Sequence, residues 1–162
     1  MNFKQSIEQG FTVADFWVNT LLSDLCDADL MKRPAAEANH IAWQIGHLMT
    51  SEAALVSMAV PDVKYTFPEG FKEKHAKTQA ATDDPKHFLS KAEYLALAAQ
   101  TRKTTLAALA KVSDAAMDRA IQAPIPFIKR AGDCFVVASH HWMLHAGQWS
   151  VVRRCLGKPR MI

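Results

Sequence analysis

The sequence predicts an all-α protein, a four-helix bundle in which residues 1–162 form one domain. Apolar residues recur at three- and four-residue spacing along four stretches of about twenty residues, which is the pattern of amphipathic helices. Capping residues begin these stretches and glycine or proline ends them, whereas no stretch has the convincing pattern of a β-strand. A chain of 162 residues is also long enough to bury one core.

The composition fits a globular protein and argues against several classes of partner. Hydrophobic residues make up 49% of the chain and charged residues 22%, and the net charge is only +3. No run of lysine and arginine with interleaved aromatic residues occurs, so we expect no nucleic-acid partner. No apolar run approaches the roughly 18 residues of a membrane span, so we expect no membrane partner. Three cysteines without a CxxC pair, and an N-terminus without a signal sequence, predict a cytoplasmic protein.

The first helix is expected over residues 2–25. Asn2 followed by Gln5 is a capping pair for its start, and Pro34 closes the region after it. Its buried stripe consists of residues at helical spacing: Ile7, Phe11, Ala14, Val18, Leu21, Leu22 and Leu25.

The second helix is expected over residues 39–59, with Asn39 as its cap and Pro61 beyond its end. A long irregular connection, residues 60–89, follows it and separates the second helix from the third. Loops of this length inside a compact domain are often lids or binding loops. We expect the two histidines of this connection, His75 and His87, to be solvated, because neither has a partner at ligand spacing.

The third helix begins at Ser90, where Glu93 completes a capping box, and is expected to reach Val112. A short helical turn over residues 114–121 follows it. The segment APIPFIKRAGD then interrupts the helical pattern, because its two prolines cannot continue a helix.

The fourth helix is expected over residues 134–156, CFVVASHHWMLHAGQWSVVRRCL, and Gly157 ends it. His141 and His145 in this helix are four residues apart, an advance of about 400°, so their imidazoles share one face. Such a pair suits two ligands of one metal ion. His140 points roughly 140° away from His145 and is not expected to join them.

His47 lies among apolar neighbours near the middle of the second helix. A lone histidine in such a helix is more often a core residue than a ligand. A buried imidazole costs a few kcal/mol unless its nitrogens are paired, however, and one metal ion on His47, His141 and His145 would pair a nitrogen of each. Three protein nitrogens and an open position are typical of a catalytic zinc site.

The predicted cofactor is one divalent metal ion, with zinc and nickel favoured. Imidazole ligands also suit cobalt or iron, and the sequence does not decide among these ions. The segment HHWMLH lacks the glutamate of the HExxH motif, so a metalloprotease of that kind is not expected.

Two stretches of the chain resemble the DinB/YfiT-like superfamily: AWQIGHL in the second helix and HHWMLHAGQWSVVRRCLGKP at the C-terminus. Members of that superfamily show a tryptophan and then a histidine in the second helix, and later an HxxxH pair, a Gly-Gln and a tail similar to Arg-Leu-Gly-Pro. The matching residues here are Trp43, His47, His141, His145, Gly147, Gln148, Arg154, Leu156, Gly157 and Pro159.

This resemblance implies a four-helix bundle, commonly dimeric, with a divalent metal ion on three histidines, which carry over to His47, His141 and His145. Some relatives are thiol S-transferases, in which the metal activates a thiol as its thiolate, and many have no known activity. The resemblance therefore implies a metal-dependent thiol S-transferase that uses a small thiol and a small electrophile and forms a homodimer. Two alternatives stay open, a non-catalytic, stress-related metal-binding bundle and a metal-dependent hydrolase.

Four further residues are candidates for roles near the metal. Gln148, three positions after His145, could orient a ligand or bond to a neighbouring helix. Glu52 could support a metal ligand or act as a base, although an exposed glutamate is the more common case. Tyr94 could supply a hydroxyl donor or pack in its helix stripe, and Cys134 could line a pocket or be structural.

Overall fold

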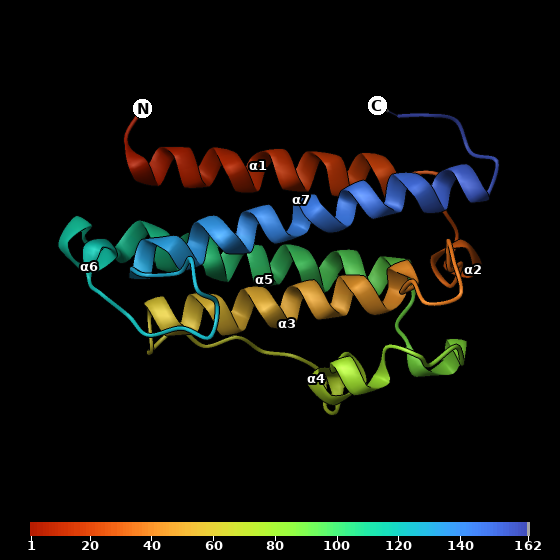
Figure 1. The fold of residues 1–162 in the computed structure, drawn as a ribbon, viewed down its shortest axis with the longest axis horizontal. Coiled ribbons are helices and arrows are strands. Elements are labelled where there is room, and N and C mark those ends of the chain that lie inside the picture. The colour runs from red at the N-terminus through yellow and green to blue at the C-terminus, as the bar shows by residue number, and fades with distance from the viewer. Residues whose placement is uncertain (162) are drawn as a thin grey trace.

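The computed structural model describes residues 1–161 and confirms the all-α fold. Four long helices form a bundle: α1 (Phe3–Leu22), α3 (Ile41–Ala59), α5 (Lys91–Lys111) and α7 (Ala131–Cys155) (Figure 1). Shorter elements lie in the connections: α2 (Asp27–Leu30), α4 (Phe71–Lys74), α6 (Asp114–Asp118), and the 3-10 turns η1 (Lys77–Gln79) and η2 (Pro85–His87). Within residues 1–161, extended backbone forms no strand and contributes only an isolated bridge between Ala120 and Arg130.

The order of the helices around the bundle differs from their order along the chain. α7 packs closely against both α1 and α3, and α3 also packs against α5, whereas α1 and α5 touch only slightly. α1 and α7 run in one direction and α3 and α5 in the other (Figure 1). The chain between α3 and α5 must therefore return along the length of the bundle, which explains why residues 60–90 are needed there.

Several predicted helix ends are confirmed. Asn2 and Gln5 form a capping box at the start of α1, and Ser90 and Glu93 form one at the start of α5. Gly157 ends the last helix with φ of 69°, a left-handed conformation that glycine adopts without the steric cost of a Cβ atom.

The cap of α3 is His40, and the prediction of Asn39 at this position is wrong. The Nδ1 atom of His40 accepts from the backbone N–H of Trp43 at 3.1 Å, and its Nε2–H donates to the carbonyl of Thr82 at 2.9 Å. An imidazole can replace the usual short polar cap here because a distant loop carbonyl fixes its tautomer.

The first and last helices also differ slightly from the prediction. α1 ends at Leu22, and a separate short helix, α2, follows it. α7 begins at Ala131, three residues before the predicted start, because the carboxylate of Asp133 accepts from the backbone N–H of Arg130 at 2.8 Å.

The connection between α3 and α5 is neither irregular throughout nor detached from the bundle. It contains α4 and two 3-10 turns, and Phe71 and His75 in it are buried. The prediction that His75 is a solvated loop residue is therefore wrong. His87, which was also expected to be solvated, is half-buried. Aromatic side chains hold this connection against the bundle, as the contact between the ring of Phe71 and that of Tyr94 in α5 illustrates.

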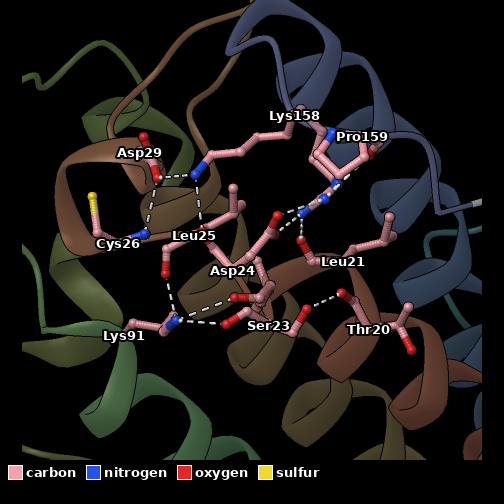
Figure 2. A network of polar contacts seen from close by, with 12 residues as sticks. Thr20, Leu21, Ser23, Asp24, Leu25, Cys26, Asp29, Lys91, Lys158 and Pro159 are labelled. Carbon is pink, nitrogen blue, oxygen red and sulfur yellow. Dashed lines mark hydrogen bonds and ion pairs between the residues drawn. The ribbon is translucent and has the colours of Figure 1, made fainter.

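Cations from other segments hold the end of α1 (Figure 2). Arg153 of α7 pairs with Asp24, and Lys158 donates to the carbonyl of Asp24 at 3.0 Å and pairs with Asp29 at 3.5 Å. Lys91 donates to three carbonyls at and after the last turn, those of Leu22, Ser23 and Leu25. These contacts satisfy carbonyls that a helix end leaves without partners and tie α1 to α5 and α7.

Within residues 1–161, no helix has both the length and the hydrophobicity that a bilayer span requires.

Candidate metal centre

Three histidines from two helices converge where α3 packs against α7. His47 comes from α3, and His141 and His145 come from α7. One ring nitrogen of each lies within 4.8 Å of the others, and all three side chains are half-buried. The ring centroid of His47 lies 5.2 Å from that of His141 and 5.7 Å from that of His145. The three histidines that the sequence singled out are thus brought together.

The helix geometry of α7 accounts for the close pair in this cluster. The Nε2 atoms of His141 and His145, one turn apart, are separated by 3.2 Å. His140 is exposed and stays outside the group, as the angular argument predicted.

Burial keeps these imidazoles neutral at physiological pH. It lowers the pKa of His47 and of His145 to about 4, with a smaller contribution from the neighbouring His141. Burial also lowers the pKa of His141. A neutral imidazole carries one proton and offers a lone pair on its other nitrogen, which is the form that binds a metal ion.

Gln44 fixes which nitrogen of His145 carries that proton. The indole Nε1–H of Trp149 can only donate, and it lies 2.8 Å from Gln44 Oε1, which identifies this atom as the amide oxygen. The same oxygen lies 2.7 Å from His145 Nδ1, so Nδ1 is the protonated nitrogen. His145 Nε2 therefore presents its lone pair to the cluster. The amide group of Gln44 is itself anchored, because its Nε2 donates to the carbonyl of Asn39 at 2.6 Å.

Trp43 holds the ring of His47. The two rings stack with centroids 4.8 Å apart and planes 7° from parallel. The indole Nε1–H of Trp43 donates to the carbonyl of Ala76 at 3.2 Å, which fixes the indole against the connection that follows α3. Among residues 1–161, neither ring nitrogen of His47 has a hydrogen-bond partner, so both are available to other ligands.

The donor set fits a divalent ion of the zinc type. Two nitrogens at about 2.05 Å from a tetrahedral zinc ion are roughly 3.3 Å apart, close to the 3.2 Å that separates His141 from His145. The remaining features also match this chemistry: neutral imidazoles, one with a fixed tautomer, in a half-buried setting. His47, His141 and His145 could therefore hold a metal ion.

An apolar groove of about 1010 Å³ opens beside the cluster. Its lining comes from α3, η1, α7 and the segment between α6 and α7, and its apolar residues include Leu55, Met58, Ile125, Phe127, Met143 and Leu144. His47 and His141 form part of the same lining. A ligand in this groove would therefore lie against two of the three imidazoles.

Glu52 is buried within the bundle, which contradicts the expectation of an exposed glutamate. Its side chain is only 1% exposed. Its oxygens accept from the hydroxyl of Thr105 at 2.5 Å and from the indole of Trp142 at 2.7 Å. Nη1 of Arg102 lies 3.3 Å away as an ion pair, although the alignment is not that of a hydrogen bond, and Arg102 also pairs with Asp15. A carboxylate engaged in this way is a structural group and is not a free base.

Within residues 1–161, the other candidates make no hydrogen bond to the three histidines. Tyr94 is buried and donates its hydroxyl proton to Nε2 of His75 at 2.7 Å, while Nδ1–H of His75 donates to a backbone carbonyl. Gln148 is exposed and, within residues 1–161, has no side-chain hydrogen bond. Cys134 is buried in the apolar core and does not line the groove, so its structural interpretation is the one supported.

Gln44 is the site residue that the sequence analysis missed. It is fully buried, although it is polar and lies in the apolar start of α3. Its position three residues before His47, and so on nearly the same helix face, is a signal that could have identified it.

Comparison with known proteins agrees with this architecture. The sequence model of the DinB superfamily matches residues 18–149, well over half of the chain. A crystal structure described as a conserved protein from Enterococcus faecalis has a similar fold, with a TM-score of 0.76 over 98% of this chain and 99% of that one. The sequences of the two are 16% identical. No curated protein matches the sequence.

Proposed function

Because the chain belongs to the DinB superfamily, we propose that it is a metal-dependent enzyme that transfers a small thiol to an apolar electrophile. One observation carries the proposal: three neutral imidazoles converge beside an apolar groove, and two of them line it. His47, His141 and His145 would hold one divalent ion, zinc or nickel. The ion would supply Lewis acidity, which lowers the pKa of a nearby thiol so that its thiolate is available at neutral pH.

The protein's own residues orient the ligands and exclude water. Gln44 keeps the proton of His145 on Nδ1, and Trp43 covers one face of His47. The apolar walls of the groove would seat the electrophile and remove water from around the sulfur. The thiol proton would leave to solvent, the sulfur would form a bond to carbon, and the leaving group would depart with its electron pair.

The environment of Glu52 favours thiol transfer over hydrolysis. A hydrolase of this type needs a base beside the reacting water. Among the described residues that line the groove there is no carboxylate. Glu52, the carboxylate that the sequence offered as a base, is engaged by Thr105, Trp142 and Arg102. Thiol activation has no such requirement, because a thiol ionises far more readily than water.

A homodimer in the cytoplasm is also part of the proposal. Two large apolar side chains, Phe16 on α1 and Leu144 on α7, are 60% and 70% exposed, which supports association with a second copy. The three cysteines are free, which suits a reducing compartment. Light scattering after size-exclusion chromatography would measure the mass of the particle.

An activity screen on zinc- or nickel-loaded protein tests the function directly. Monochlorobimane would be offered with several small thiols, and product fluorescence followed over time. We expect turnover that falls at least about 100-fold in His145→Ala and is unchanged in Glu8→Ala, an exposed position on α1. One bound equivalent of metal, a large fall in melting temperature on chelation, and no turnover with any pair would favour the non-catalytic alternative instead.

A further inference from the structure

Lys77 is the ammonium group that faces the groove beside the three histidines. Among the described residues that line this groove, the ionisable side chains are those of Lys77, His47, His140 and His141, and none is acidic. Within residues 1–161, no carboxylate lies within ion-pair distance of Lys77 either. The groove therefore carries one positive charge, that of Lys77, which has no carboxylate partner, and most of the other lining residues are apolar.

The backbone on either side of Lys77 is held in place. Lys77 begins η1 directly after Ala76, whose carbonyl accepts from the indole of Trp43. One residue earlier, His75 is buried and bonded through both ring nitrogens, to Tyr94 and to the carbonyl of Phe71. The Lys77 side chain is exposed, but the backbone from which it extends is held in place by these contacts.

Gly46 explains how His75 comes so close to α3. A Cβ atom at Gly46 would lie 2.1 Å from the ring of His75, a distance at which the two could not coexist. Gly46 immediately precedes His47, so the contact fixes the connection beside the candidate metal ligand. The glycine and the buried histidine thus bring the start of η1 to the end of the groove where His47 lies.

Lys77 and His47 both line this groove. A divalent ion on the three histidines would add positive charge at the same place. An anionic group on a ligand would be attracted there, whereas a neutral or cationic group would gain nothing from Lys77.

We propose that the groove selects an organic anion, and that Lys77 binds its carboxylate while its apolar body lies against Leu55, Phe127 and Leu144. The electrophilic substrate is thus an aryl- or alkyl-carboxylate. This inference rests on the proposed function, because it takes the groove as the seat of the electrophile. Lys77 is then a specificity-determining residue, because the groove would distinguish ligands of equal size by whether they carry a negative charge.

Nuclear magnetic resonance titration of zinc-loaded protein tests this selectivity with a matched pair of ligands. The pair is 4-phenylbutyrate, which is anionic, and 4-phenylbutanol, which has a similar apolar body and no charge. We expect the anion to bind about three- to fivefold more tightly, and both ligands to shift amide signals of Leu55 and Leu144. The preference should disappear in Lys77→Gln and persist in Lys77→Arg.

Lys103→Gln is the matched control. Lys103 lines a second groove, of about 810 Å³, that contains several lysines and lies against the C-terminal half of α5. This variant should leave the preference unchanged. Equal dissociation constants for the two ligands, an undiminished preference in Lys77→Gln, or shifts confined to the second groove would each overturn the inference.

The binding measurement separates this inference from the proposed function. It requires no turnover, so a preference that depends on Lys77 can stand even if no thiol is transferred. Conversely, if monochlorobimane is turned over while wild-type protein binds both ligands equally, the thiol-transfer proposal survives and the selectivity proposal fails.

Discussion

Two polar clusters cross the interface between α3 and α7, and they differ in how their atoms are paired. In one, Glu52 accepts from Trp142 and Thr105 and pairs with Arg102. In the other, His47 meets His141 and His145, and their ring nitrogens converge. The two clusters are neighbours, since Glu52 follows His47 by five residues and Trp142 directly follows His141.

The comparison teaches that residue type alone does not identify a functional site. Buried polar atoms must be paired, because water is no longer there to solvate them. The carboxylate of Glu52 finds its donors within the chain, so its two oxygens are already paired. The three imidazoles bring ring nitrogens to within 4.8 Å of one another, and a metal ion could bind all three. Four predictions would break or sharpen this contrast.

The largest expected effect is on stability, from Glu52→Ala. Without Glu52, the buried guanidinium of Arg102 keeps only the more exposed Asp15 as its anionic partner, and removing one partner of a buried ion pair typically costs about 3–5 kcal/mol. We therefore expect the free energy of unfolding in urea to fall by this amount. The control Glu8→Ala, on the exposed face of α1, should change it by less than about 0.5 kcal/mol. Folded Glu52→Ala protein that no longer binds zinc would contradict the division of roles between the clusters.

His145→Ala should weaken zinc binding strongly and change the stability of the protein little. Loss of one of three ligands should weaken zinc binding at least about 100-fold, since even the loss of an outer partner of a ligand costs 10- to 100-fold. The stability of the metal-free protein should change little, because this imidazole is half-buried. Competition with a chromogenic chelator measures the affinity. His140→Ala, an exposed histidine one position before His141, should bind zinc as wild type does.

Gln44→Leu should affect both zinc affinity and stability. It removes the acceptor that holds the proton of His145 on Nδ1, so zinc binding should weaken by about 10- to 100-fold. The same change leaves the indole of Trp149 without its acceptor, which should cost about 1–3 kcal/mol of stability. Gln148→Leu, at an exposed position, is the control for both measurements. Unaltered zinc affinity in Gln44→Leu would show that the tautomer does not matter.

The last prediction concerns pH. Burial lowers the pKa of His47, His145 and His75 to about 4 in the folded state, compared with about 6.5 in an unfolded chain. The unfolded chain therefore binds more protons between pH 6.5 and pH 4, so stability falls as the pH is lowered through this window.

Thermal melts of metal-free protein would measure this dependence. The melting temperature should be nearly constant above pH 6.5 and should decrease by several degrees towards pH 4. His47→Gln should flatten the slope without removing it, because His75 and His145 remain. A melting temperature that rises on acidification would contradict the burial of these imidazoles in their neutral form.

Much of the helical framework was predictable because its signals are local. The apolar stripes have a period of 3.6 residues, and the capping pairs Asn2–Gln5 and Ser90–Glu93 lie within single turns. The shared face of His141 and His145 follows from helix geometry alone. The connection of residues 60–89 was less predictable, because its burial depends on where α4 meets the bundle.

By itself, the sequence determined the helices, most of their ends and the pairing of two histidines on one helix face, since each depends on neighbours within about five residues. Only the tertiary structure decided which side chains from distant helices meet. In the tertiary structure, Glu52 is buried against Trp142 and the ring of His75 packs on Gly46. Gln44 contacts His145, which lies 101 residues further along the chain. The physical reason is that the pairing of a buried polar atom depends on the packing of facing helices, which a periodic pattern along one helix does not specify.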